Sequence, residues 1–161
     1  MRKNSKGFSL IELLIVVAII LIIAAIAIPN LLRSRIAANQ ASAVGSLRTL
    51  NTAEITYATT YNTGFTLTMS YLQPDGNGGT TPNVTAAGLI DSVLASGSKS
   101  GYKFYYSLGA TETTGRVDTY SFTAVPVSNN TGTNYYFTDQ SGVIRQNSTA
   151  TATSSDSPIA G

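Results

Sequence analysis

The chain has 161 residues, of which 11% are charged, with ten basic and eight acidic side chains and neither cysteine nor histidine. Without cysteine there are no disulfides and no thiolate chemistry, and without histidine the commonest metal ligand and neutral-pH general base are missing. Arg2, Lys3 and Lys6 supply three of the ten basic residues, so seven remain against the eight acidic ones and no basic stripe is left for nucleic acid. We therefore expect no enzyme, cofactor, metal site or directly bound nucleic acid.

A nearly unbroken apolar segment follows the basic start of the chain. Only Ser9 and Glu12 interrupt residues 8–28, and as a helix these 21 residues would be about 31 Å long, the thickness of a bilayer core. The basic residues ahead of this segment predict a cytoplasmic N-terminus. Two plain interpretations are a single-pass anchor and a secretory signal peptide with Ala25-Ile26-Ala27 as its cleavage site.

Glu12 argues against both plain interpretations. An acid inside an apolar helix costs roughly 2.5–3.5 kcal/mol on membrane-insertion scales, and neither an anchor nor a discarded signal has a use for it. A buried carboxylate persists where a cation neutralises it, and the surrounding helix offers no such cation. The sequence therefore indicates a partner outside this helix.

Residues 6–12, with the sequence KGFSLIE, resemble the class III signal of type IV prepilins and pseudopilins. The resemblance implies that prepilin peptidase cleaves between Gly7 and Phe8 and that Phe8 becomes the N-methylated first residue. It makes Glu12 the acid that pairs with the terminal amine of a neighbouring subunit, and Pro29 the helix proline of the family. It also implies a helical homo-oligomeric filament, an inner-membrane assembly platform, and membrane lipid around the helix before assembly.

Pro29 is expected to disturb the helix. It has no amide hydrogen to bond the carbonyl of Ala25, so the helix should kink, loosen or stop there. The helical pattern continues after Pro29, which favours a disturbed but continuous helix. The resemblance further implies that residues 21–28 melt locally in the filament.

The segment after Pro29 has the pattern of an amphipathic helix. Its apolar side chains recur at spacings of three, four or seven residues, and Asn62-Thr63-Gly64 supplies a stop signal. One helix is therefore predicted from about Phe8 to Tyr61. The apolar positions are Leu32, Ile36, Ala43, Val44, Leu47, Leu50, Tyr57 and Tyr61.

The rest of the chain predicts loops followed by a sheet. Residues 65–100 are mostly loop, with a short helix within 87–95, and a four-stranded antiparallel meander follows whose inner face covers Val44, Leu47 and Leu50. Asp139 lies in the last hairpin loop and is interpreted as a turn aspartate rather than a calcium ligand, because nearby carboxylates are missing. The predicted strands span residues 102–108, 117–125, 135–138 and 143–145.

These elements predict an α+β fold, the pilin "lollipop", in which a long N-terminal helix packs on a C-terminal antiparallel meander. The predicted divisions are a leader over 1–7, a transmembrane or filament-core helix over 8–29, an amphipathic head helix over 30–62, loops and sheet over 63–146, and a disordered Ser/Thr-rich tail over 147–161.

The function that this resemblance implies is a structural subunit of a type IV pilus that supports adhesion, twitching motility or DNA uptake. The precursor would lie in the inner membrane and the assembled pilus outside the cell. Two alternatives are a pseudopilin of a type II secretion system and a membrane-anchored periplasmic binding domain. Type IVa pilins usually pin their C-terminal region with a disulfide, which this chain cannot form.

Overall fold

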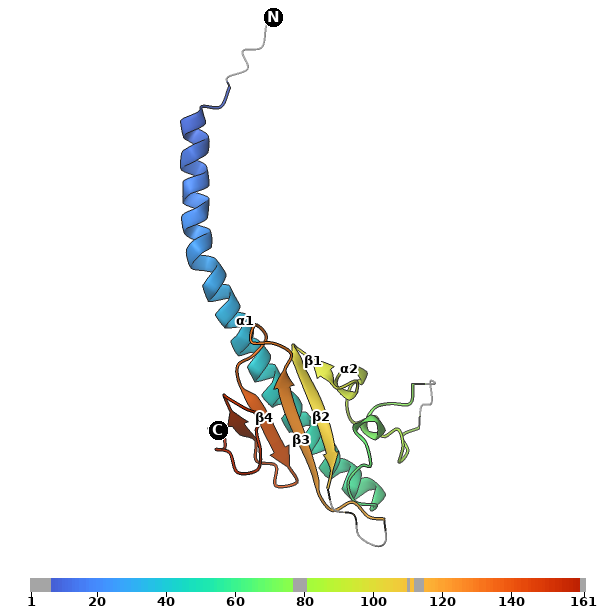
Figure 1. Cartoon of the computed structure of the whole chain (residues 1–161). Coiled ribbons are helices and arrows are strands. Elements are labelled where there is room, and N and C mark those ends of the chain that lie inside the picture. Colours follow the sequence, from blue (N-terminus) through green and yellow to red (C-terminus); the bar gives the residue numbers. More distant parts are fainter. Residues whose placement is uncertain (1–6, 77–80, 110, 112–114, 160–161) are drawn as a thin grey trace, which may run out of the picture. The chain divides into compact units, whose positions relative to one another are not determined.

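The structure is a computed structural model that describes residues 7–76, 81–109, 111 and 115–159. The basic leader residues Arg2, Lys3 and Lys6 lie outside these described residues. The chain divides into two units, Met1–Arg35 and Ile36–Gly161. Helix α1, Leu10–Tyr61, contributes to both of them (Figure 1).

The described part of the first unit is largely an apolar helix whose large side chains are exposed in the single chain. The exposed fraction is 76% for Leu10 and still 57% for Ile28. Among the described residues, α1 contains the one segment long and apolar enough to cross a membrane, and none of that segment is buried. About 21 residues of apolar surface are thus left for lipid or for other chains to bury.

The helix is continuous through Pro29, as predicted, and the interpretation of Pro29 as a helix stop is wrong. The helix begins at Leu10, two residues after the predicted start at Phe8. Residues 21–28 are helical in the single chain. Melting of this stretch is expected only of the filament and stays a prediction.

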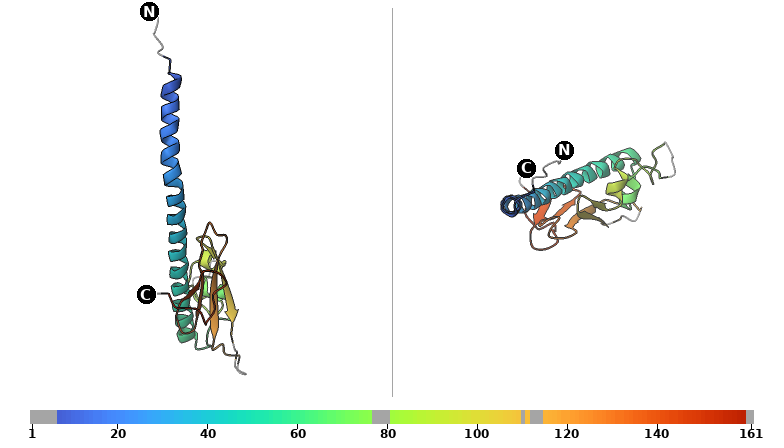
Figure 2. Two further views of the ribbon diagram at one scale, coloured as in Figure 1. Left: turned by 60° about the vertical axis from the view of Figure 1, so that its left-hand side comes forward. Right: turned by 90° about the horizontal axis from the view of Figure 1, so that it is seen from above.

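The second unit forms a head in which the later part of α1 lies along a five-stranded sheet (Figures 1 and 2). The strands follow one another in the order β1-β2-β3-β4-β5, and every neighbouring pair is antiparallel. Antiparallel neighbours need only short connections, which explains the meander. The strands are β1 Ser98–Lys99, β2 Tyr102–Leu108, β3 Tyr120–Pro126, β4 Tyr135–Asp139 and β5 Arg145–Asn147.

The core lies between α1 and one face of the sheet. Leu47 and Leu50 are fully buried, and Val44 is partly buried against the same cluster, as predicted. Along β3 the side chains of Tyr120, Phe122 and Ala124 point inward at the two-residue period of a strand. Burying each large apolar side chain contributes roughly 1.5–3 kcal/mol to folding. The apolar face of α1 therefore determines how the helix packs against the sheet.

The observed elements differ from the predicted ones mainly at their ends. Strand β1 was not predicted, because two residues carry no readable periodicity. Strand β3 begins three residues late, since Val117 instead forms isolated bridges with Gly64 and Thr111. The short helix α2, Ser92–Ala95, falls within the predicted range, whereas the 3-10 helix η1, Met69–Leu72, was expected to be loop.

The prediction of a disordered tail over 147–161 is wrong for residues 147–159. The N–H of Ile159 donates to the carbonyl of Ile144 at 2.9 Å, and the N–H of Gln146 donates to the carbonyl of Ser157 at 3.0 Å. Ala152 is only 2% exposed, and Ile159 packs against the core. A low apolar content predicts disorder only when nothing anchors the segment, and here the open edge of β5 and two apolar side chains anchor it.

Candidate assembly segment and the contacts of the head

The N-terminus of α1 is closed by a hydrogen bond from Ser9 to Glu12. The backbone N–H of Ser9 donates to Glu12 Oε2 at 2.9 Å, and the carbonyl of Ser9 accepts the first helical bond from Leu13. Ser9 therefore occupies the N-cap position, with Glu12 three residues later as in a capping box. This cap was not predicted, although the S-x-x-E spacing is a signal that could have revealed it.

Capping leaves part of the Glu12 carboxylate available. Among the described residues, only the Ser9 N–H donates to this carboxylate, and it does so at Oε2; the residue is exposed in the single chain. A negative charge in the first helical turn is also favoured by the helix dipole. Glu12 therefore caps the helix, and its carboxylate can still accept a hydrogen bond from a cationic donor.

The predicted cleavage site lies outside the helix. Gly7 and Phe8 precede α1, and both are exposed, Phe8 at 77%. A Cβ placed on Gly7 would meet no atom within 4 Å. The Gly7–Phe8 bond is therefore in a segment where a peptidase can reach the backbone without unwinding helix.

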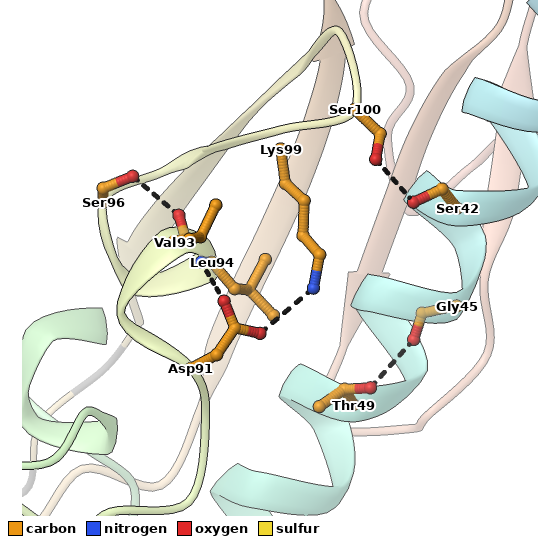
Figure 3. Close-up of polar contacts among 9 residues, drawn as sticks. All are labelled: Ser42, Gly45, Thr49, Asp91, Val93, Leu94, Ser96, Lys99 and Ser100. Carbon is orange, nitrogen blue, oxygen red and sulfur yellow. Dashed lines mark hydrogen bonds and ion pairs between the residues drawn. The ribbon is translucent and has the colours of Figure 1, made fainter.

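In the head, polar contacts join α2, β1 and the turn after β1 to one another and to α1 (Figure 3). Asp91 accepts from the N–H of Leu94 at 2.8 Å, which caps α2, and pairs with Lys99 Nζ at 3.0 Å. These two contacts, the cap first, lower the pKa of the Asp91 carboxyl. The Ser42 hydroxyl of α1 donates to the hydroxyl of Ser100, in the turn between β1 and β2, at 2.9 Å and so joins this turn to the helix.

A second loop is held by the same part of α1. Asn39 Nδ2 donates to the carbonyl of Thr131 at 2.9 Å, and Gln40 Nε2 donates to Thr133 Oγ1 at the same distance. Both threonines lie in the β3–β4 connection. The early turns of the head helix therefore fix the loops at one end of the sheet.

Glu54 is fully buried, which was not predicted from the sequence. Its carboxylate accepts two hydrogen bonds from Thr66, from the N–H at 3.0 Å and from Oγ1 at 2.6 Å. Burial raises the pKa of Glu54, and the two bonds from Thr66 lower it by less. Because Glu54 follows Leu47 and Leu50 on the buried face of α1, its helical spacing is the signal that could have revealed it.

The contacts of Glu54 have a structural consequence. They tie the chain that follows α1 back onto the helix, and the Tyr106 hydroxyl donates to the carbonyl of Thr66 on the other side of that chain. A neighbouring pair of bonds links Tyr120, Asn51 and Thr138 across the core at 3.1 and 2.8 Å. These hydrogen bonds fix the turn of the chain after α1. The described side chains that make them are buried or partly buried, so we assign them a structural role.

Asp139 lies where a turn aspartate should lie. Its Oδ1 accepts from the N–H of Ser141 at 2.9 Å, and the N–H of Gly142 donates to its carbonyl at the same distance. Within the part of the chain that the structure describes, no three His, Cys, Asp or Glu side chains are grouped so that they could hold a metal ion.

A long apolar N-terminal helix followed by a C-terminal antiparallel sheet fits the α+β pilin fold that was predicted. The family model described as the prokaryotic N-terminal methylation motif matches residues 2–28. That match contains Gly7, Phe8 and Glu12. The N-terminal segment of this chain therefore carries the methylation motif that its sequence resembles.

Two curated proteins are similar to the start of the chain. The type IV wide pilus major component PilA4 of Thermus thermophilus is 68% identical over 37 residues, which is 23% of this chain and 28% of that protein. The type IV major pilin protein PilA of Myxococcus xanthus is 49% identical over 53 residues, 33% of this chain and 24% of that protein. The chain thus covers about a quarter of each relative, and no solved structure matches. Both relatives are named as pilus proteins and neither as an enzyme.

Proposed function

We propose that this chain is a structural subunit of a type IV pilus. Prepilin peptidase cleaves it between Gly7 and Phe8, the new amine of Phe8 is methylated, and the apolar part of α1 packs among the same helices of other copies. The observation that carries this proposal is the methylation motif over 2–28 on a helix whose apolar side chains nothing in the described chain covers.

Hydrophobic burial keeps the apolar part of α1 out of water both before and after assembly. The apolar side chains from Leu10 to Ile28 are about half exposed or more in the single chain, apart from the smaller alanines and valines among them. Lipid covers them in the precursor, and neighbouring helices cover them in the filament. The same surface therefore serves both states.

Glu12 sets the register between copies. In a core of apolar helices an unpaired carboxylate costs several kcal/mol, and the α-amine of Phe8 from another copy neutralises it. Glu12 Oε1 is the acceptor for that amine, while Oε2 keeps the Ser9 N–H. Pro29 gives the helix a position without an i−4 hydrogen bond, where it can adapt as copies pack.

Topology follows from the charges before the apolar helix. Arg2, Lys3 and Lys6 hold the N-terminus in the cytoplasm, so the head lies across the inner membrane until an assembly platform extracts the subunit. The assembled filament is extracellular and supports adhesion, twitching motility or DNA uptake. Nothing in the described head indicates catalysis, so the role is structural.

Shearing cells that express this chain tests the proposal. We expect the sheared fraction to contain filaments in which this chain is abundant. A chain that is cleaved at Phe8 but scarce in that fraction would indicate a minor pilin or a pseudopilin of a secretion system. A chain that stays in the membrane with Met1 intact would indicate a tethered periplasmic domain and contradict the proposal.

A further inference from the structure

Two arginines follow the apolar part of α1. Arg33 and Arg35 lie within two helical turns of Ile28, and both are exposed in the single chain. None of the ion pairs among the described residues includes either arginine. Both guanidinium groups are therefore available to an anionic partner from outside the chain.

The length of the helix places these arginines at the depth of lipid headgroups. A hydrocarbon core about 30 Å thick that begins at Leu10 ends roughly 20 residues later, near Asn30, the first polar residue after the apolar run. Arg33 and Arg35 then lie roughly 5 and 8 Å further along the helix axis, and the headgroup layer adds roughly 5–8 Å on each side of the core. Helical side chains also lean toward the helix N-terminus, which brings both guanidinium groups back toward this layer.

The two arginines lie on nearly opposite sides of α1. Consecutive residues of an α-helix are about 100° apart, so Arg33 and Arg35 are about 160° apart around the axis. A single protein surface that docks on one side of the helix would contact only one of them. A layer of headgroups surrounds the helix and can contact both, so this arrangement favours lipid over one docked protein.

We propose that Arg33 and Arg35 bind the headgroups of anionic phospholipids in the leaflet at this end of the apolar helix. A guanidinium group donates a fork of hydrogen bonds that fits phosphate oxygens, and its charge favours a headgroup with a net negative charge over a zwitterionic one. The free energy that a basic residue gains near an anionic surface corresponds to about fivefold in lipid preference for each arginine. This inference rests on the membrane-embedded precursor of the proposed function and names the lipid class that surrounds it.

The absence of cysteine allows a fluorescent reporter between the two arginines. Ser34 is exposed, and its hydroxyl donates to the carbonyl of Asn30 at 3.0 Å, so labelled Ser34→Cys should leave the helix intact. The full labelled chain is placed in vesicles of phosphatidylglycerol and phosphatidylcholine, of which one or the other has brominated acyl chains that quench the fluorophore. We expect brominated phosphatidylglycerol to quench more strongly, by an amount that corresponds to local enrichment of about fivefold or more.

Variants of the reporter chain assign this preference to the two arginines. Arg33→Gln with Arg35→Gln should abolish it, and Arg33→Lys with Arg35→Lys should keep most of it because the charges remain. The matched control is Arg48→Gln, since Arg48 is an exposed arginine more than three turns further along α1. It should keep the full preference. Equal quenching by the two brominated lipids in the reporter chain, or an unchanged preference in the glutamine pair, would overturn the proposal.

Added salts test the contact without any further substitution. Sodium chloride screens exposed charges, so the preference should fall as its concentration rises from about 0.02 M to about 0.5 M. Inorganic phosphate at equal ionic strength should lower it no further, because the partner is a headgroup in the bilayer. A preference that salt leaves unchanged, or one that phosphate removes at an ionic strength where chloride does not, would contradict lipid binding.

Failure of this inference is distinguishable from failure of the proposed function. Equal quenching by both lipids would remove the headgroup contact and leave the filament assay on sheared cells unaffected. A reporter that neither brominated lipid quenches would show that this end of the helix does not reach the bilayer. That result would overturn the inference and also contradict the membrane-embedded precursor.

Discussion

The N–H of Ser9 donates to Glu12 Oε2 at 2.9 Å, so the acid at the start of α1 caps its own helix. A cap alone would account for an acid at this position. Capping and pairing between copies make different demands on the side chain, however. Capping needs an oxygen that accepts a hydrogen bond, whereas pairing with an amine in an apolar core needs a negative charge.

Glu12→Gln separates these two roles. The amide oxygen still accepts the Ser9 N–H, so the cap is kept while the charge is lost. We expect Glu12→Gln and Glu12→Ala to be cleaved and inserted normally and to reduce sheared filaments about tenfold or more, as removal of one partner from a buried ion pair does. Quantifying sheared and membrane-bound chain by immunoblot checks this. Normal filament yield from Glu12→Gln would assign Glu12 to capping alone.

Glu54 should make the head less stable as the pH rises. Its folded pKa is raised above the ordinary 4.5, so the folded head keeps a proton that the unfolded chain releases. The free energy of unfolding therefore falls as the pH increases from about 4.5 through the raised folded pKa, and levels off above it. The neighbouring tyrosines, Tyr57, Tyr106 and Tyr120, all have raised pKa values and do not titrate in this window.

Glu54→Gln should remove that pH dependence. A glutamine can accept from the Thr66 N–H and donate to its hydroxyl, so the contacts survive without the charge. Urea denaturation of the full chain in detergent micelles, followed by far-UV circular dichroism at several pH values, measures the effect. An unchanged fall in stability with pH in Glu54→Gln would mean that another group is responsible.

Thr66→Val tests the contribution of the hydroxyl bond at constant shape. The variant keeps the N–H of residue 66 but removes the donor that lies 2.6 Å from Glu54 Oε1. Loss of a hydrogen bond to an ionised or partly ionised group should destabilise the head by roughly 1.5–3 kcal/mol. Thr68→Val is a suitable comparison, since the Thr68 side chain caps the short helix η1. Equal destabilisation would contradict a special role for Thr66.

Asp156 should hold the C-terminal segment on the sheet edge. Its carboxylate accepts from the Thr153 N–H at 2.7 Å and from Asn147 Nδ2 at 2.8 Å, and these bonds lower its pKa. Asp156→Ala should raise amide exchange at Ile159 and speed proteolysis after residue 147, while exchange within β3 stays unchanged. Ser154→Ala, an exposed neighbour, is the control. Identical exchange in the two variants would show that Ala152 and Ile159 anchor the segment without Asp156.

The sequence predicted the parts of the fold that have long, strong patterns. Apolar spacing placed the buried face of α1 at Leu47 and Leu50, and two-residue alternation placed β2 and β3, because both signals repeat over many residues. Strand β1 and helix η1 are too short for any periodicity to appear. Their positions depend on contacts with segments far away in the chain, which one sequence does not display.

The sequence marks Glu12 as a candidate site residue, and its role in assembly stays a prediction. A lone acid in an apolar run marks Glu12 without structural knowledge, since a charge in such surroundings is too costly to keep without a role. The ordered structure of residues 147–159 was not predicted from the sequence. Composition shows that the segment has few large apolar residues, but it does not show that the segment covers the edge of β5.

Determining the N-terminus of the mature protein tests the central claim most directly. Mass spectrometry of the N-terminal peptide from purified filaments should find that it begins at Phe8 and carries a methyl group on its α-amine. A mature chain that begins at Ile28 would show that the apolar segment is a removed signal peptide. One that begins at Met1 would show a permanent anchor, and either result would contradict assembly through the helix that follows Phe8.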